Sequence, residues 1–362
     1  MLLLNKSEVG NSSKPLHNGD ISASYIFKIR EFILELSIAL ELYERHMPFF
    51  TGQITAPEGI TLNVLEIGET LERRHGLDRH HRMLRDLEFD ICEMSLGSYI
   101  LGLSRDPNFP MVGIPVFPRR YFSASQIYIN VNSEIKTPRD LMGRNVGITA
   151  FQVTLSVLAK GDLKRDYGVD WRDINWHCMR REQLPVEFPD GVSVQRIPEG
   201  ADIGEMLAIG EIDALICPQP PAKSLKSLAA AGDKIRRLFV DPEAEDERYF
   251  KKYGYFPVMH LLAMRRDTSE KAPDIPTAMI EMWNRSKDIA YSYYEDPAYA
   301  LLAWTSNIFK AQRERMASDL WPSGIAANRK NLQTFLNYCD DQGLMDRPLS
   351  VEDLFAESVR NS

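Results

Sequence analysis

Residues 82–98 have the sequence RMLRDLEFDICEMSLGS, and this stretch decides the fold expected around it. It has the order of a helix end, a buried strand and a polar turn that opens the next helix. In an open α/β sheet, ligands bind outside the carboxyl ends of the strands, where a new helix offers unpaired N–H groups to an anion. We therefore expect Glu93, Ser95 and Ser98 at a binding site. The alternative is a simple helix cap, because serine favours helix N-termini whether or not anything binds.

The composition indicates a large globular protein. The chain has 362 residues, 44% of them hydrophobic, which is enough for two domains of ordinary size. Its 43 basic and 51 acidic residues give a formal net charge of −8 without a long block of either sign, so no nucleic-acid partner is expected. Arginines can still form a positive pocket in an acidic protein, so an anionic ligand stays open. No uncharged apolar stretch reaches about 18 residues, so no membrane partner is expected.

Cysteine usage and the N-terminal sequence indicate a cytoplasmic protein. The four cysteines, Cys92, Cys178, Cys217 and Cys339, have neither metal-ligand spacing nor a disulfide-rich pattern, and we expect reduced thiols. The apolar start at residues 2–4 is too short for a signal peptide. Residues 1–27 include a stretch rich in Ser, Asn, Gly and Lys and are expected to form a mobile leader.

Strand and helix patterns alternate over most of the chain and predict a mostly parallel α/β sheet. Residues 33–42 are too few to separate a strand from a short helix. Strands are expected at 60–65, 90–94, 111–116, 126–131, 145–148, 193–197 and 212–216. Helices are expected at 82–86, 99–103, 137–141, 152–160 and 203–209, and after Pro257 at 273–294, 298–309 and 328–338. The pattern predicts two lobes with a cleft between them.

A series of short motifs resembles the 4,5-dihydroxyphthalate decarboxylase family, and the similarity covers most of the chain after about residue 40. The motifs occur in the family's order and are PEGI at 57–60, EMSL at 93–96 with SY at 98–99, IPVFP at 114–118, IPEG at 197–200, GEIDAL at 210–215, FPVMH at 256–260 and WPSG at 321–324, followed by NR at 328–329 and QGL at 342–344. The resemblance implies a two-lobed α/β fold of the type 2 periplasmic-binding-protein kind, without export. It places lobe I at 28–127 and 256–362, and lobe II at 128–255.

The chain departs from the family pattern in two places. Tyr43-Glu44-Arg45 stands where the family commonly has Tyr-Asp-Arg, which keeps the charges. Ser123-Ala124-Ser125 stands where family members often have a basic residue and a histidine. Because alanine cannot transfer a proton, the protein would use another acid, accept a different substrate or catalyse an altered reaction.

The resemblance implies decarboxylation of a hydroxylated aromatic carboxylate without a cofactor, which requires anion anchors, an acid and a base. Whether a divalent metal assists stays open from the sequence. Arg45, Arg119 and Arg120 are the candidate anchors, because a guanidinium offers paired donors to a carboxylate. We expect at most two of them to face the cleft. The alternative for Arg119 and Arg120 is a solvated loop.

His260 is the preferred acid, because a histidine titrates near neutral pH. The alternative is a hydrogen-bonded core histidine. Glu93 is the second choice, since desolvation in so apolar a strand is expected to disfavour its charged form and make it a proton donor or a base for a phenol. Tyr43 could serve as acid or base.

Further substrate contacts are expected from the turn after residues 145–148 and from two other positions. Phe151, Gln152 and Thr154 lie where backbone N–H groups could close on a carboxylate; the alternative is a capping turn. Ser125 and His81 are also placed at the substrate. His75, His80 and His81 are close in sequence, but adjacent histidines lie on different faces of a helix and the neighbouring arginines oppose a cation, so we expect a solvated helix start and no metal.

Three functions stay open from the sequence. The first is the decarboxylase, acting on a small aromatic carboxylate enclosed between the lobes. The second is a cytoplasmic solute-binding-like protein that holds an aromatic or anionic ligand without turnover. The third is a related enzyme of specialised metabolism with altered chemistry, suggested by Ala124 and the turn at 217–220. A homo-oligomer is also left open.

Overall fold

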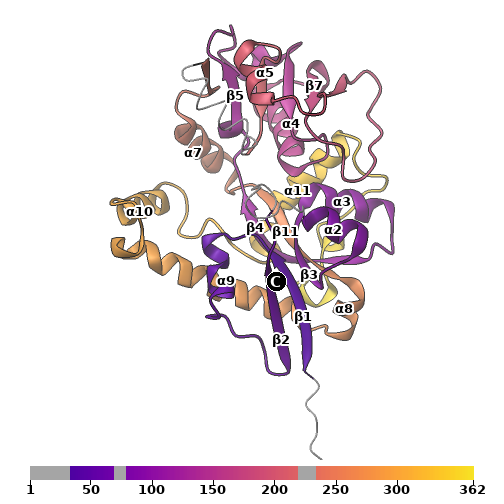
Figure 1. Cartoon of the computed structure of the whole chain (residues 1–362), viewed down its shortest axis with the longest axis vertical. Coiled ribbons are helices and arrows are strands. Elements are labelled where there is room, and N and C mark those ends of the chain that lie inside the picture. The colour runs from indigo at the N-terminus through magenta and orange to yellow at the C-terminus, as the bar shows by residue number, and fades with distance from the viewer. Residues whose placement is uncertain (1–32, 69–78, 219–233) are drawn as a thin grey trace, which may run out of the picture.

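The computed structural model describes residues 33–68, 79–218 and 234–362. The leader predicted at 1–27, His75 and the second half of the turn at 217–220 lie outside these residues. Two separate sheets, each with its own helices, form the two lobes seen in Figure 1. Among the described residues, no helix has both the length and the apolar content needed to cross a membrane.

The first sheet has the strand order β2-β1-β3-β11-β4 and defines lobe I. Its strands are β1 (Leu34–Leu40), β2 (Ile60–Glu66), β3 (Ile91–Ser95), β4 (Met111–Arg120) and β11 (Val258–Arg265). β1 runs parallel to β2 and β3, whereas β11 is antiparallel to both β3 and β4. All five residues of β3 are buried, so the sheet carries Glu93 into its interior.

Short and long helices connect and follow these strands. They are α1 (Met47–Phe50), α2 (Arg79–Asp86), α3 (Leu96–Arg105), α8 (Arg266–Lys271), α9 (Ile275–Glu295), α10 (Thr305–Arg315) and α11 (Ile325–Asp341). Single 3₁₀ turns lie at Glu44–His46, Pro297–Tyr299, Glu352–Leu354 and Glu357–Val359. α9 packs against β4, and α10 follows it as the arm that projects from the side of the molecule in Figure 1.

The second sheet has the order β10-β5-β9-β6-β7-β8 and defines lobe II. Its strands are β5 (Ile127–Asn130), β6 (Asn145–Ile148), β7 (Asn175–Cys178), β8 (Val194–Arg196), β9 (Ala214–Ile216) and β10 (Ile235–Arg237). Its helices are α4 (Thr154–Tyr167), α5 (Ile203–Ile209) and α7 (Pro242–Tyr253), with 3₁₀ turns at Ala124–Gln126, Pro138–Leu141 and Trp171–Asp173. The four strands β9, β6, β7 and β8 are parallel; at one side β5 is antiparallel to β9, and β10 is antiparallel to β5.

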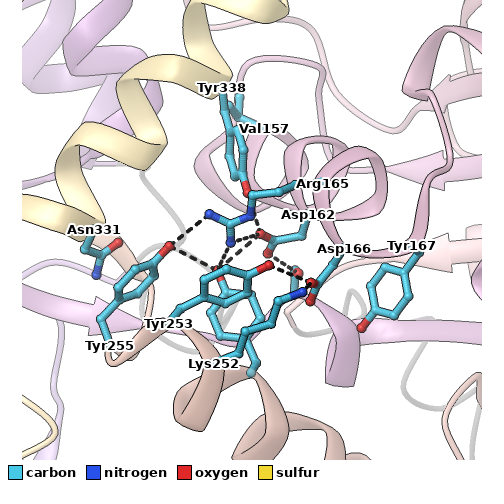
Figure 2. Close-up of polar contacts among 12 residues, drawn as sticks. Val157, Asp162, Arg165, Asp166, Tyr167, Lys252, Tyr253, Tyr255, Asn331 and Tyr338 are labelled. Carbon is cyan, nitrogen blue, oxygen red and sulfur yellow. Dashed lines mark hydrogen bonds and ion pairs between the residues drawn. The ribbon is translucent and has the colours of Figure 1, made fainter.

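The chain passes between the lobes at residues 121–126 and again at 254–257. A cluster around Asp162 and Arg165 of α4 contacts both crossings. Asp162 accepts hydrogen bonds from Ser123 (2.7 Å) on the first crossing and from Tyr338 (2.9 Å) of α11. Its neighbour Arg165 donates to Tyr255 (3.3 Å) on the second crossing. Figure 2 shows this cluster, in which the guanidinium also lies over the ring of Tyr253, 3.8 Å from the ring centroid. The cluster holds α4 and α11 against these two crossings, which together form the hinge between the lobes.

Most elements lie where the sequence predicts them, with informative differences at several ends. The 33–42 segment is a strand, and strand 145–148 and helix 203–209 agree with their predicted bounds. The strand predicted at 111–116 continues to Arg120, so the alternative of a solvated loop at Arg119 and Arg120 is wrong. The helix predicted at 298–309 begins at Thr305 after a separate 3₁₀ turn.

Candidate active site

A cavity of about 200 Å³ lies between the lobes, at the carboxyl ends of β3, β4, β6, β7 and β9. Its lining residues are His80, His81, Ser95, Arg119, Tyr121, Thr149, Ala150, Val153, Thr154, Leu155, Arg180, Arg181, Gln183, Pro218, Met259 and His260. An engineered cavity of about 150 Å³ accommodates benzene, so this space fits a ligand with one aromatic ring. Its position is the one at which α/β sheets bind ligands.

His260 and Glu93 form a hydrogen-bonded pair on neighbouring strands at the cavity wall. The Nδ1 atom of His260 lies 2.6 Å from Oε1 of Glu93, because β11 and β3 are paired antiparallel with their side chains on one face of the sheet. The His260 side chain lines the cavity, and Glu93 lies behind it with no exposed surface. The carboxylate therefore fixes the orientation of the imidazole ring, with Nδ1 directed at Glu93.

Arg79 holds Glu93 from the other side. Its Nη2 lies 3.0 Å from Oε2 of Glu93, and its Nη1 lies 3.2 Å from Oε2 of Glu41, with the guanidinium fully buried. Tyr43 adds a longer hydrogen bond from its hydroxyl to Glu93 (3.4 Å). The sequence analysis did not predict Arg79 as a site residue, because the neighbouring histidines indicated a solvated helix start.

The charge state predicted for Glu93 is wrong. Burial by itself raises the pKa of this carboxyl, but the charge of Arg79 and the hydrogen bond from His260 outweigh that effect. The pKa of Glu93 is therefore held well below its usual value, and the group is an ionised carboxylate at neutral pH. Glu93 is an acceptor and a counter-charge in this site, and it has no proton to donate.

The two predicted arginine anchors on β4 point to opposite faces of the sheet, because side chains alternate along a strand. Arg119 lines the cavity, with its guanidinium 5.3 Å from the ring centroid of Tyr121. Arg120 is on the opposite face and donates to the carbonyl oxygens of Phe256 (2.7 Å) and Pro322 (2.9 Å). Burial lowers the pKa of Arg120 to about 9. The prediction that Arg120 contacts substrate is wrong, because successive strand residues point to opposite faces.

Three further predicted contacts lie away from the cavity lining. Arg45 donates to the carbonyl oxygen of Pro118 (2.6 Å) and lies between the rings of Tyr43 and Trp321, about 4 Å from each centroid. Tyr43 contacts Glu93 and does not line the cavity. Ser125 is buried at the hinge, where its hydroxyl donates to the carbonyl oxygen of Phe122 (3.2 Å). None of these three side chains is part of the cavity lining.

The junction of β3 and α3 contacts the second lobe directly. The hydroxyls of Ser95 and Thr154 are 3.0 Å apart, and the backbone N–H of Gly97 donates to Thr154 (3.0 Å). Both hydroxyl residues line the cavity. Ser98 is fully buried and donates to the side-chain oxygen of Gln183 (2.7 Å), so it acts behind the lining rather than in it.

The backbone N–H groups predicted to close on a substrate carboxylate already bind a carboxylate of the protein. The N–H groups of Phe151 and Gln152 donate to the two oxygens of Glu182, at 2.7 and 3.0 Å. The side chains of Phe151 and Gln152 are buried and do not line the cavity. The prediction of a substrate carboxylate at these two residues is therefore wrong, although the turn does have the anion affinity that its position predicts.

The two histidines at the start of α2 have different surroundings. His80 is buried, lines the cavity and makes an edge-to-face contact with His260, with ring centroids 5.0 Å apart. His81 is exposed at the cavity mouth, as part of the lining. The predicted solvated helix start is therefore confirmed for His81 and wrong for His80. Sequence reasoning also missed Arg180 and Arg181 of the lining, because no strand was predicted at 175–178 to bring them there.

Comparison with known proteins assigns the chain to a family. It is 30% identical to 4,5-dihydroxyphthalate decarboxylase of Comamonas testosteroni over 330 residues, which cover 89% of this chain and 96% of that protein. The chain belongs to the 4,5-dihydroxyphthalate decarboxylase family. The Pseudomonas putida 4,5-dihydroxyphthalate decarboxylase is 29% identical over 228 residues, or 61% of this chain and 83% of that protein. The resemblance inferred from the motifs is thus confirmed, and with it membership of an enzyme family of carboxy-lyases. No family model matches the chain.

Solved structures with the same architecture confirm the predicted fold class. This chain is similar to the periplasmic aliphatic sulphonate binding protein SsuA of Escherichia coli. The TM-score is 0.53 at 13% identity, and the match covers 91% of this chain and 99% of SsuA. The sulfonate-binding protein SsuA of Methylobacillus flagellatus has a TM-score of 0.52 at 12% identity, covering 90% and 92%. At such identities the likeness establishes the two-lobed fold alone.

Proposed function

We propose that the protein decarboxylates a hydroxylated aromatic carboxylate such as 4,5-dihydroxyphthalate, by protonation of the ring and loss of carbon dioxide. Family membership supports the reaction class. The observation that carries the proposal is the contact of 2.6 Å between His260 and the buried Glu93 at the wall of a cavity sized for one aromatic ring. An oriented imidazole is the group most often used as a general acid near neutral pH.

In the proposed reaction, Arg119 binds a substrate carboxylate and holds the ring against His260. The imidazolium Nε2–H gives its proton to the ring carbon that carries the departing carboxylate. The bond from that carbon to the carboxylate then breaks, carbon dioxide leaves, and the bonding pair returns to the ring and restores its aromaticity. A ring hydroxyl ortho or para to the protonated carbon stabilises the cationic intermediate before the bond breaks.

Glu93 supports the acid in this scheme without changing its own protonation state. Its ionised carboxylate stabilises the positive charge of the His260 imidazolium before the proton passes to the substrate, and Arg79 holds Glu93 ionised. The arrangement resembles the general pattern in which a buried carboxylate orients a catalytic histidine and stabilises its imidazolium form. Glu93 is therefore proposed as the positioning group and His260 as the acid.

The direct test is incubation of the purified protein with 4,5-dihydroxyphthalate and a panel of hydroxylated benzoates. We expect release of carbon dioxide and, in D₂O, a product that carries one deuterium at the vacated ring carbon. If a panel member raises the melting temperature without any release, the cleft binds aromatic acids and the decarboxylase proposal is overturned in favour of ligand binding alone.

A further inference from the structure

Residues 180–185 form a strap that passes from the end of β7 across the cleft to α3. The strap leaves lobe II by continuing the pairing of β7, where the backbone N–H of Arg180 donates to the carbonyl oxygen of Thr149 (2.8 Å). It then approaches lobe I, where Ser98 donates to Gln183 (2.7 Å) and Arg105 donates to the carbonyl oxygen of Pro185 (2.5 Å). The strap is thus attached to both lobes beside the cavity.

Glu182 fixes the middle of the strap to the turn before α4. Its carboxylate accepts one hydrogen bond from each of the N–H groups of Phe151 and Gln152, and the Gln152 side chain donates back to the carbonyl oxygen of Leu184 (2.9 Å). The turn is also held by α4, because the buried amine of Lys160 donates to the carbonyl oxygen of Phe151 (2.9 Å). Hydrogen bonds to a charged acceptor are stronger than those between neutral groups, so the two hydrogen bonds to Glu182 restrict the motion of the strap.

The two residues that precede Glu182 carry positive charge at the cavity. Arg180 and Arg181 both line it and both are exposed to solvent. Within the part of the chain that the structure describes, neither guanidinium makes a hydrogen bond or ion pair with another side chain. Arg119 lies on the opposite lobe of the same cavity. A ligand in the cavity therefore meets guanidinium groups from both lobes.

We infer that the strap selects substrates with a second carboxylate: Arg180 and Arg181 bind that group while Glu182 positions them. This inference rests on the proposed function for its substrate class. Arg119 would hold one carboxylate from lobe I and the strap the other from lobe II, so a dicarboxylate bridges the lobes whereas a monocarboxylate contacts one side only. Guanidinium pairs suit this task because their donors match the planar carboxylate.

The test of the arginines compares two ligands by titration calorimetry, which requires no turnover. The ligands are phthalate, a dicarboxylate without the hydroxyls, and benzoate, its monocarboxylate counterpart. In Arg180→Gln/Arg181→Gln the affinity for phthalate is expected to fall about tenfold or more, with benzoate affinity within about twofold of the original. An equal effect on both ligands, or none on either, would overturn the inference. Because binding alone is measured, failure of the decarboxylase proposal leaves this test intact.

The test of Glu182 uses Glu182→Gln, with Glu187→Gln as the matched control at an exposed position farther along the same segment. Hydrogen exchange of peptides covering 149–154 and 180–185 is expected to accelerate in Glu182→Gln and to stay unchanged in the control. The KM for a dicarboxylate substrate is expected to rise about tenfold with a smaller change in kcat. Unchanged exchange, or a lower KM because Glu182 competes with the substrate carboxylate, would contradict a positioning role.

Discussion

Arg119 and Arg120 are neighbours on β4 and have separate tasks, because the strand turns one toward the cavity and the other toward the C-terminal segment. Arg120 donates to Phe256, Pro322 and the side-chain oxygen of Asn328 (2.7 Å). Arg119 lines the cavity together with His260, its partner in the β4–β11 pairing. The sequence gives both residues the same chemistry, and only the period of two along a strand distinguishes them.

Replacing each arginine with lysine is expected to separate binding from stability. Arg119→Lys loses paired donation to a carboxylate, so the affinity for an aromatic carboxylate should fall about tenfold, with a smaller loss of unfolding free energy than in Arg120→Lys. Arg120→Lys leaves buried carbonyl oxygens without donors and should lower the free energy of unfolding by about 2 kcal/mol. Calorimetric titration and denaturant unfolding measure the two effects. Unchanged affinity in Arg119→Lys would place Arg119 outside the site.

His46 provides a pH-dependent contribution to stability. Its ring is fully buried, with Nδ1 2.6 Å from the carbonyl oxygen of Glu41, and burial lowers its pKa to about 4. Because the unfolded chain binds this proton more tightly, the contribution is complete above about pH 6.5 and is lost as the pH falls toward 4. The loss amounts to about 3 kcal/mol at pH 4.

Denaturant unfolding of wild type and His46→Gln between pH 7 and pH 4 checks this contribution. Glutamine keeps a donor and does not titrate, so the stability advantage of wild type over the variant should shrink by about 3 kcal/mol across the range. Other acid-sensitive groups are common to both proteins and cancel in the difference. A difference that is constant with pH would show that His46 is not held neutral.

At the scale of elements, the junction of β3 and α3 is the feature that the sequence predicted most completely. The buried strand and the new helix both follow from the pattern at 82–98, and Ser95 lines the cavity. The polar turn predicted between them is wrong, because α3 begins at Leu96, directly after β3, and includes Ser98. The charge of Glu93 did not follow, because it depends on Arg79 and His260 from other elements. Local patterns predict elements, whereas ionisation is decided by tertiary partners.

Gly97, near the start of α3, allows the two lobes to come into contact. A Cβ atom at residue 97 would lie 2.4 Å from the carbonyl oxygen of Gln152, which is backbone and cannot move aside cheaply. Replacing glycine by alanine inside a helix ordinarily stabilises by about 1 kcal/mol. Here we expect Gly97→Ala to lower the free energy of unfolding by about 2 kcal/mol instead and to weaken ligand affinity, because the lobes must separate. A gain in stability in denaturant unfolding would contradict this close approach.

At the scale of the whole molecule, two sheets meet around one cavity and are tied together behind it. The sequence predicted two lobes from alternation and a return to lobe I near His260, and β11 does complete the first sheet. It did not predict the strap at 180–185 or the Asp162 cluster in Figure 2. Both depend on contacts between residues far apart along the chain, which periodicity does not report.

The claim on which this account depends is that His260, held by Glu93, donates the proton that releases carbon dioxide. The measurement that tests it is the single-turnover rate of carbon dioxide release by His260→Gln and wild type, with ligand affinity determined for both. The account predicts a fall of about 100-fold or more in rate with affinity within about threefold. Release by His260→Gln at the wild-type rate would contradict it.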